Sequence, residues 1–238
     1  MATPIYTIRC TKNERIANAV YDITFTKPDG FTFAPGQFLM FDVPLVSNPS
    51  DIQPRAYSIA SHPSEPELRL VVRLKPGGRA SEWVEKMLTA GMDVVVKGPM
   101  GLFHLHADAS KDILFVCTGA GIAPFRPMMR QAIELWPDRR IDLLHGVSVH
   151  EDLFWQEEMG AIVAAHPHAH VHYALSRPTE EWSGLRGRVQ EVLPTIITDI
   201  AHRNIYVCGN PDMTKELKAL CLQQWGVPKE DFHMEGYV

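Results

Sequence analysis

The chain has 238 residues, of which 45% are hydrophobic and 21% are charged, the composition of a globular protein with one or two domains. Its net charge of −5 argues against a general nucleic-acid binder, because contact with a phosphate backbone requires a basic surface. No apolar run is long enough to cross a bilayer, and the first twenty residues contain no hydrophobic signal core. We therefore expect a soluble, cytoplasmic protein that has no membrane span and binds no nucleic acid.

The first hundred residues predict short strands separated by turns rich in proline and glycine. The expected strands cover residues 5–10, 19–26, 37–43, 57–60, 68–74 and 93–97. Six strands at this spacing favour a small antiparallel barrel. One amphipathic segment, 81–88, predicts a helix that ends at Gly91.

After about His106 the pattern changes to buried strands that alternate with helices. Strands are expected at 113–117, 141–144, 171–175 and 204–208, and helices at 124–135, 155–165, 189–193 and 213–224. This alternation predicts a parallel sheet covered by helices on both faces. We place the boundary between the two domains after residue 106.

The four cysteines, Cys10, Cys117, Cys208 and Cys221, are far apart in the sequence and form no close-spaced pair. Zinc and iron–sulfur sites usually use clustered cysteines, so we expect no metal site. Histidines alternate from position 166 to position 172 and could face a metal from one side of a strand. An exposed loop that leads into a strand edge is the simpler interpretation of that pattern.

Two segments point to nucleotide chemistry. The run Arg55-Ala56-Tyr57-Ser58 offers a cation for a pyrophosphate, a flat ring for stacking and a hydroxyl, which together suit a flavin. Residues 116–124 predict the end of a strand that runs into a glycine turn, where a second nucleotide could bind. This turn departs from the G-x-G-x-x-G pattern because Pro124 stands at the third glycine position, and a tight strand-to-helix turn would explain it equally well.

Five segments in order resemble the ferredoxin–NADP(+) reductase superfamily along nearly the whole chain. They are residues 55–58, 77–81, 98–103, 118–124 and 208–213. The resemblance implies an antiparallel six-stranded FAD-binding β-barrel over residues 1–106, followed by a Rossmann-like NAD(P)-binding α/β domain over 107–238. It implies an FAD-dependent oxidoreductase that transfers a hydride between NAD(P)H and FAD and exchanges single electrons with a protein acceptor.

The same resemblance assigns an FAD site. Arg55 would neutralise the pyrophosphate, Tyr57 would stack on the isoalloxazine ring, and Ser58 would hydrogen-bond near N5. The further FAD-binding residues implied are Ala56, Val71, Val72, Arg73, Gly78, Arg79, Ala80, Ser81, Thr118 and Tyr237. Near the C-terminus, Glu235 could relay protons and Tyr237 could shield the flavin. Alternatively, this segment is a final strand at the sheet edge with Glu235 in solvent.

The resemblance also assigns a site for the nicotinamide coenzyme. The implied residues are Gly119, Gly121, Ala123, Pro124, Ser176, Arg177, Cys208, Gly209 and Met213. Cys208 would lie against the nicotinamide C4, so that Ser58, Cys208 and Glu235 form the catalytic set. A buried cysteine that packs as a small hydrophobe is the alternative interpretation of Cys208. Ser176 and Arg177 resemble part of a 2′-phosphate site, yet the sequence leaves NADPH and NADH equally open.

The expected partner is a small acidic electron-transfer protein, either ferredoxin, flavodoxin or the iron–sulfur component of an oxygenase, that docks on a monomer or weak dimer. Basic residues that could face it are Lys12, Arg15, Arg73, Lys75 and Arg79. Two alternatives stay open: a reductase of free flavin, and an electron-transfer subunit that docks permanently on an oxygenase or another larger oxidoreductase.

Overall fold

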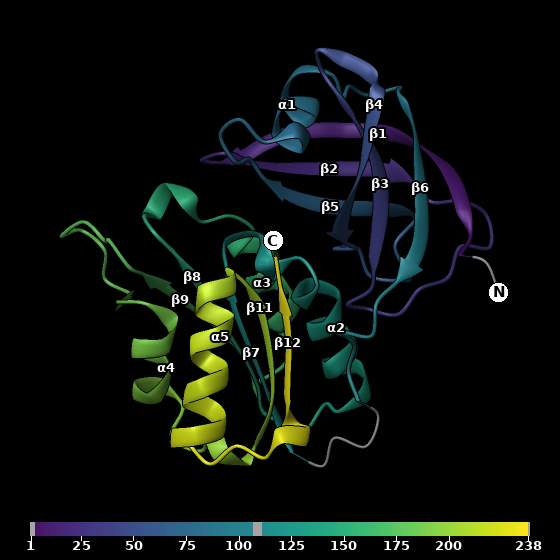
Figure 1. Cartoon of the computed structure of the whole chain (residues 1–238). Coiled ribbons are helices and arrows are strands. Elements are labelled where there is room, and N and C mark those ends of the chain that lie inside the picture. The colour runs from purple at the N-terminus through teal and green to yellow at the C-terminus, as the bar shows by residue number, and fades with distance from the viewer. Residues whose placement is uncertain (1–2, 107–110, 238) are drawn as a thin grey trace. The chain divides into compact units, whose positions relative to one another are not determined.

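The computed structural model describes residues 3–106 and 111–237, and its contacts group the chain into two compact units (Figure 1). The first unit comprises Met1–His104 with Arg126–Met128, and the second comprises Leu105–Phe125 with Met129–Val238. The predicted boundary after residue 106 adjoins positions 107–110, which lie outside the described residues. Each unit is a separate layer structure with its own core.

The first unit is a six-stranded antiparallel sheet. Its strands are β1 (Ile5–Ala17), β2 (Val20–Thr26), β3 (Phe38–Leu45), β4 (Asn48–Ser58), β5 (Glu67–Arg73) and β6 (Asp93–Met100), in the order β4-β3-β6-β1-β2-β5. The terminal strands β4 and β5 also contact each other, and just beyond β4 the Ala60 N–H donates to the Arg69 carbonyl at 2.7 Å. The sheet therefore rolls toward a barrel, as predicted.

The core of this barrel forms because inward-facing residues alternate along the strands. On β3, Leu39, Phe41 and Val43 are fully buried, and the Phe41 ring contacts the rings of Tyr57 and Trp83. Trp83 comes from helix α1 (Arg79–Lys86), which closes the barrel with its amphipathic face.

Two local predictions in the first unit are wrong. The strand expected at 57–60 is in fact β4, which begins at Asn48. The sequence does not predict residues 48–54 because they are largely exposed, include Pro49 and Pro54, and lack the alternation that marks a buried strand. Helix α1 ends at Lys86, and Gly91, with φ +94°, instead serves the turn before β6, where its N–H donates to the Cys10 carbonyl.

The second unit is a six-stranded parallel sheet. Its strands are β7 (Asp112–Thr118), β8 (Ile141–Val147), β9 (Ala169–Leu175), β10 (Leu185–Arg186), β11 (Arg203–Gly209) and β12 (Phe232–Gly236), in the order β10-β9-β8-β7-β11-β12. The main helices are α2 (Phe125–Leu135), α3 (Gln156–Val163), α4 (Val189–Ile196) and α5 (Pro211–Ala219). The predicted parallel sheet with helices is confirmed.

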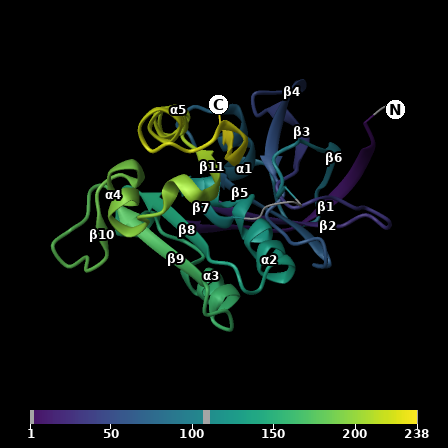
Figure 2. The same cartoon turned by 90° about the horizontal axis from the view of Figure 1, so that it is seen from below.

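The helices divide between the two faces of this sheet: α4 and α5 cover one face, and α2 and α3 cover the other (Figure 2). On the α4/α5 face, side chains from β7, β8 and β11 such as Val116, Leu144 and Val207 form a wholly apolar cluster with both helices. On the α2/α3 face, the Phe115 ring packs 5.0 Å from Phe125, the first residue of α2.

Two helices differ from their predicted bounds. The segment expected as one helix over 213–224 consists of α5 and a short π-helical turn, Leu220–Gln224. Helix α3 begins at Gln156 and not at Trp155, because Trp155 has φ +59°, a left-handed conformation that is uncommon for a bulky side chain. Helix α5 begins two residues before its predicted start, at Pro211, and Asn210 accepts a capping hydrogen bond from the Asp212 amide at 2.8 Å.

Buried charges lie near the amino-terminal ends of the parallel strands. Arg203 and Asp142 are both fully buried and lie 3.1 Å apart, and Asp199 pairs with Arg203 at 2.9 Å. Burial alone would raise the pKa of Asp142, but hydrogen bonds from His172 and Arg140 outweigh it and lower the pKa. This network links β8, β9 and β11 to one another.

His172 thus has a carboxylate partner that the sequence alone does not reveal, whereas His168 and His170 are exposed. In the part of the chain that the structure describes, no group of three histidine, cysteine or acidic side chains is arranged to hold a metal ion. Across the same residues, no helix is both long enough and apolar enough to span a membrane.

Candidate functional site

In the first unit, the end of β4 presents the predicted flavin-binding run. The half-buried Arg55 guanidinium donates to the Pro54 carbonyl at 2.7 Å and to Gln53 Oε1 at 3.0 Å, which leaves further N–H donors for a ligand. The Tyr57 ring meets Phe41 edge-on at 5.6 Å. Burial raises the pKa of Tyr57 to about 12, despite the charge of Arg55, so its phenol stays neutral. Ser58 is buried beside it.

The loop before α1 leaves little room for a side chain at position 78. A Cβ added to Gly78 would lie 3.0 Å from the Lys75 carbonyl oxygen and 3.1 Å from Ser81 Oγ. The Ser81 hydroxyl accepts the Lys75 N–H at 2.7 Å and can still donate its own hydrogen. No side chain caps the first turn of α1, so its amide hydrogens are available to an anion.

The other predicted FAD residues of this unit differ in their roles. The guanidinium of Arg79, one of the predicted FAD-binding residues, donates to the carbonyl oxygen of Asp51 at 2.6 Å and to its carboxylate at 3.0 Å, and thereby links α1 to β4. The sequence does not indicate Asp51 as the partner of Arg79, because no strand is predicted at residue 51. Val71 and Val72 are buried on β5, and Arg73 is exposed at its end. Since β5 is an edge strand, one side of its backbone lacks a strand partner.

In the second unit, the ends of β7 and β11 interlock through glycines. A Cβ on Gly121 would lie 2.3 Å from the Cys208 carbonyl oxygen, and one on Gly209 would lie 2.5 Å from Thr118 Oγ1. The Asn210 N–H also donates to Thr118 Oγ1 at 3.1 Å. These glycines are therefore required first for backbone packing, and the Thr118 hydroxyl, predicted to contact FAD, is engaged by the β11 end.

Gly119 opens the short 3-10 turn Gly119–Ile122 with φ +53°. Three of the predicted coenzyme residues, Ala123, Pro124 and Met213, are buried.

Cys208 is fully buried at the end of β11. Burial raises the pKa of its thiol well above the usual range, and a hydrogen bond from Tyr237 offsets only part of the shift. The Tyr237 N–H donates to the Gly209 carbonyl at 3.0 Å, which fixes the chain end beside Cys208. A thiol with so high a pKa is a poor nucleophile, which agrees with the predicted role in shaping a binding surface.

Glu235 lies on β12, in register with Cys208. The segment is the edge strand that the sequence offered as an alternative, but Glu235 is half-buried and not in solvent. Burial raises the pKa of its carboxyl to about 7, and Oε2 is buried with no hydrogen-bond partner among the described residues. An orphaned carboxylate oxygen with this pKa suits a group that takes up and releases a proton near neutrality.

The register of the sheet extends this cluster into a row of five polar side chains on one face. In-register neighbours of a parallel sheet point to the same side, which places Glu235, Cys208, Cys117, His145 and Tyr173 in a line across β12, β11, β7, β8 and β9. We call this set the polar row. The sequence does not predict His145 as a site residue, because the strand expected there ends at residue 144. A histidine directly before a glycine at the end of a buried strand is the pattern that could have indicated it.

The segment after β9 holds the predicted 2′-phosphate residues. Ser176 and Arg177 are exposed, and their amides donate to the carbonyls of Val147 and Ser148 at 3.1 and 2.8 Å. Arg186 is engaged elsewhere, because its guanidinium donates to backbone carbonyls, including that of Glu180 at 3.0 Å.

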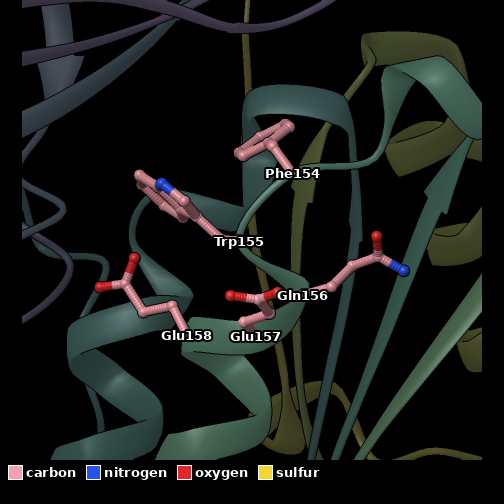
Figure 3. Close-up of a pocket in the computed structure, with 5 residues that line it drawn as sticks. All are labelled: Phe154, Trp155, Gln156, Glu157 and Glu158. Atoms are coloured by element: carbon pink, nitrogen blue, oxygen red, sulfur yellow. The ribbon is translucent and has the colours of Figure 1, made fainter.

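A hollow of about 600 Å³ opens at the start of α3, lined by Phe154, Trp155, Gln156, Glu157 and Glu158 (Figure 3). Trp155 and Glu158 extend to one side of the backbone and Gln156 to the other. None of the predicted site residues lines this hollow. We therefore base the site on the strand ends and not on this concavity.

Comparison with known proteins agrees with both halves of this geometry. Residues 8–105 match the oxidoreductase FAD-binding domain family, and residues 115–219 match the oxidoreductase NAD-binding domain family. The chain is 31% identical over 227 residues to ferredoxin–NADP reductase B of Sorangium cellulosum, covering 92% of this chain and 91% of that relative.

Other similar proteins are longer. The glycine betaine monooxygenase reductase subunit of Chromohalobacter salexigens is 27% identical over 242 residues, and the match covers 98% of this chain but only 64% of that relative. The structure of the Amycolatopsis cytochrome P450 reductase GcoB matches with a TM-score of 0.87 at 25% identity, covering 99% of this chain and 71% of the other. The family matches, the similarity over most of a ferredoxin–NADP reductase and the two-unit fold show that the chain belongs to the ferredoxin–NADP(+) reductase superfamily, as an FAD-dependent NAD(P)H oxidoreductase.

Proposed function

We propose that this enzyme passes a hydride from NAD(P)H to FAD and delivers the electrons singly to a separate acceptor protein. The observation that carries the proposal is the cluster of Cys208, Glu235 and Tyr237 against the Gly119–Ile122 turn. Bound FAD supplies the redox chemistry that the side chains lack, because it accepts two electrons together and can release them one at a time. The protein supplies binding, orientation and control of protons.

The first unit fits FAD. Arg55 has donors to spare for a pyrophosphate, and the uncapped first turn of α1 offers amide hydrogens to the same group. Gly78 leaves room for phosphate oxygens where a Cβ would fill the cradle between Lys75 and Ser81. The neutral Tyr57 ring offers a flat surface, and Ser58 lies next to it for the flavin N5. We assign FAD binding to residues 1–106 and coenzyme binding to 107–238 on this basis.

The second unit fits the nicotinamide end of the coenzyme. Cys208 presents a neutral sulfur, and the unpartnered Oε2 of Glu235 gains a partner when a polar ligand binds. Tyr237 is hydrogen-bonded to Cys208, and its side chain would have to move away for a nicotinamide to reach that sulfur. We assign proton uptake and release at the carboxyl group to Glu235.

Coenzyme choice rests on the segment after β9. Arg177 is exposed, and a guanidinium at this position can pair with the 2′-phosphate that distinguishes NADPH from NADH. Arg186 holds backbone carbonyls and does not contribute. We infer that the enzyme accepts both coenzymes and that Arg177 favours NADPH.

The acceptor is a small acidic electron-transfer protein. Of the basic residues expected to face it, Lys12 pairs with Glu14 at 2.9 Å and Arg79 pairs with Asp51, whereas Arg73 and Lys75 are exposed at the end of β5. The matched relatives are named as reductases of ferredoxin, of a monooxygenase and of cytochrome P450, which supports an external acceptor. The four cysteines are buried and unpaired, so we place the enzyme in the reducing cytoplasm.

The test is to measure electron delivery by enzyme that has been freed of unbound flavin by gel filtration. We expect NADPH-dependent or NADH-dependent reduction of added ferredoxin or flavodoxin without added FAD, and a rate that falls as salt rises because docking is electrostatic. A rate that appears only when free FAD or FMN is supplied, in proportion to that flavin, would instead identify a free-flavin reductase.

A further inference from the structure

His145 occupies the centre of the polar row. It is fully buried on β8, in register with Cys117 on β7 and Tyr173 on β9. Its ring lies edge-on to that of Phe154 at 5.6 Å and 6.1 Å from the ring of Tyr173. The imidazole is therefore held from both sides by aromatic packing.

One of those nitrogens reaches the glycine turn. Nε2 of His145 lies 3.0 Å from the carbonyl oxygen of Gly119. A carbonyl can only accept, so Nε2 carries the hydrogen and Nδ1 is bare. Burial lowers the pKa of His145 to about 4, although the bond to Gly119 offsets part of the shift, and the ring is thus neutral at pH 7.

The other nitrogen gains nothing from this arrangement. Nδ1 is buried and has no hydrogen-bond partner within residues 3–106 and 111–237. An orphaned buried acceptor costs free energy, and an aliphatic or phenyl side chain would fill the same space without that cost. The preceding strand positions, Leu143 and Leu144, show that β8 accommodates aliphatic side chains. What histidine adds here is the N–H bond to Gly119.

Gly119 is the position at which such an anchor matters most. Its φ of +53° is a conformation that glycine enters and leaves with little steric restraint, so the direction of its carbonyl is weakly set by the backbone itself. The far side of the turn is restrained differently, because Gly121 is pressed against the Cys208 carbonyl. Gly119 is itself buried, and His145 adds a side-chain hydrogen bond to its carbonyl at the start of the turn.

We propose that His145 is a positioning residue for the nicotinamide coenzyme: it holds the Gly119 carbonyl inside the protein, so that the turn offers amide hydrogens to the coenzyme's pyrophosphate. A carbonyl oxygen turned toward a phosphate would repel it, whereas amide N–H groups attract it. This inference rests on the proposed function of the turn and adds to it a residue that touches neither coenzyme nor flavin.

The test compares three substitutions of His145 in the FAD-loaded enzyme. His145→Phe keeps the ring and removes the donor, His145→Asn carries an amide too short to reach Gly119, and His145→Gln carries an amide at the level of Nε2. We expect the dissociation constants of NADP⁺ and NAD⁺ to rise about threefold to tenfold in the Phe and Asn variants, which is the range for loss of one hydrogen bond. The Gln variant should recover most of the affinity, and FAD content and kcat at saturating coenzyme should change by less than about threefold.

Tyr173→Phe is the matched control, because it removes a buried hydroxyl from the same row without touching the turn. We expect wild-type coenzyme affinity in this variant.

A second readout needs no coenzyme: amide hydrogen exchange of the segment 118–124. Exchange should be faster in His145→Asn and His145→Phe and unchanged in His145→Gln and Tyr173→Phe. Wild-type affinity and exchange in His145→Asn would overturn the proposal, and so would equal losses in the Asn and Gln variants. If wild-type enzyme binds neither coenzyme, the proposed function itself is refuted, whatever the exchange data show. Should the Phe variant not fold, the Asn and Gln pair still decides between these results.

Discussion

The two faces of the parallel sheet are built from the same strands but differ in chemistry. On the α4/α5 face, Val116, Leu144 and Val207 pack into one apolar cluster. The buried pair of Asp142 and Arg203 lies on this face too, but nearer the amino-terminal ends of the strands. On the α2/α3 face, the intervening positions include the polar row, which ends at Glu235 on the sheet edge. The difference indicates that, toward the carboxyl ends of the strands, the α4/α5 face contributes apolar packing, while the α2/α3 face carries the polar row of the proposed site.

The largest effect on stability is expected from the α4/α5 face. Leu144→Ala removes a fully buried side chain and leaves a cavity, which should lower the free energy of unfolding by about 2–5 kcal/mol. Denaturant titration measures this loss, and the rate of flavin reduction in the folded enzyme should stay at the wild-type value. Leu135→Ala, at a residue that is 53% exposed, is the control that should change neither quantity. Slower flavin reduction in Leu144→Ala would contradict the comparison, because it would show that the α4/α5 face also affects the reaction.

The next effect concerns the interlocked glycines. In Gly121→Ala the new Cβ, 2.3 Å from the Cys208 carbonyl oxygen, would force the turn and the β11 end apart. A displacement of this size should slow flavin reduction about 100-fold, since positioning errors near 1 Å have effects of that order. Stopped-flow absorbance checks the rate. Gly160→Ala on α3, where a Cβ meets open space, should react as the wild type does.

Two buried cysteines allow a smaller and better matched comparison. Cys208→Ala on the α2/α3 face should slow flavin reduction about tenfold and leave FAD bound, because it alters only the surface against which the nicotinamide lies. Cys221→Ala, in the apolar cluster of the α4/α5 face, should reduce stability without slowing reduction. Equal rates in the two variants would remove Cys208 from the coenzyme site.

The smallest effect is a change in pH dependence at Glu235. Burial raises the pKa of this carboxyl from 4.5 to about 7, so the folded protein holds a proton between these values that the unfolded chain does not. The stability that this proton contributes is complete below pH 4.5 and is lost as the pH rises through 7.

Glu235→Gln should abolish that part of the pH dependence and remove an inflection near pH 7 from the turnover profile. Denaturation and turnover measured from pH 5 to pH 9 test both expectations. A profile in Glu235→Gln that matches the wild type would show that another group titrates there.

The sequence predicts the helices and strands in which burial follows a regular pattern. It misses the segments in which burial is irregular. The strands of the parallel sheet follow from continuous apolar runs such as that in β7, and the helices follow from their apolar faces. The first half of strand β4 gives no strand pattern in the sequence, because Ile52 and its neighbours lie on an exposed edge and the strand contains Pro49 and Pro54. Helix α3 was placed one residue early, since the left-handed Trp155 has no signature in composition.

For the site, the sequence identified residues by type but not their contacts. Gly121 and Gly209 are predicted as coenzyme-binding residues, and the sequence does not indicate that each also makes room for the backbone or side chain of the neighbouring segment. Arg79 is predicted as an FAD-binding residue, and the sequence does not indicate that its side chain pairs with Asp51, 28 residues away. Such pairings depend on tertiary packing, as does the burial that shifts the pKa of Glu235, and no local pattern encodes them.

The measurement that tests the central claim most directly is an absorption spectrum of the purified enzyme under anaerobic conditions, followed during separate additions of NADH and NADPH. The account predicts a bound flavin whose absorption band bleaches with both coenzymes, faster with NADPH because of Arg177. A colourless protein, or a bound flavin that neither coenzyme reduces, would contradict it.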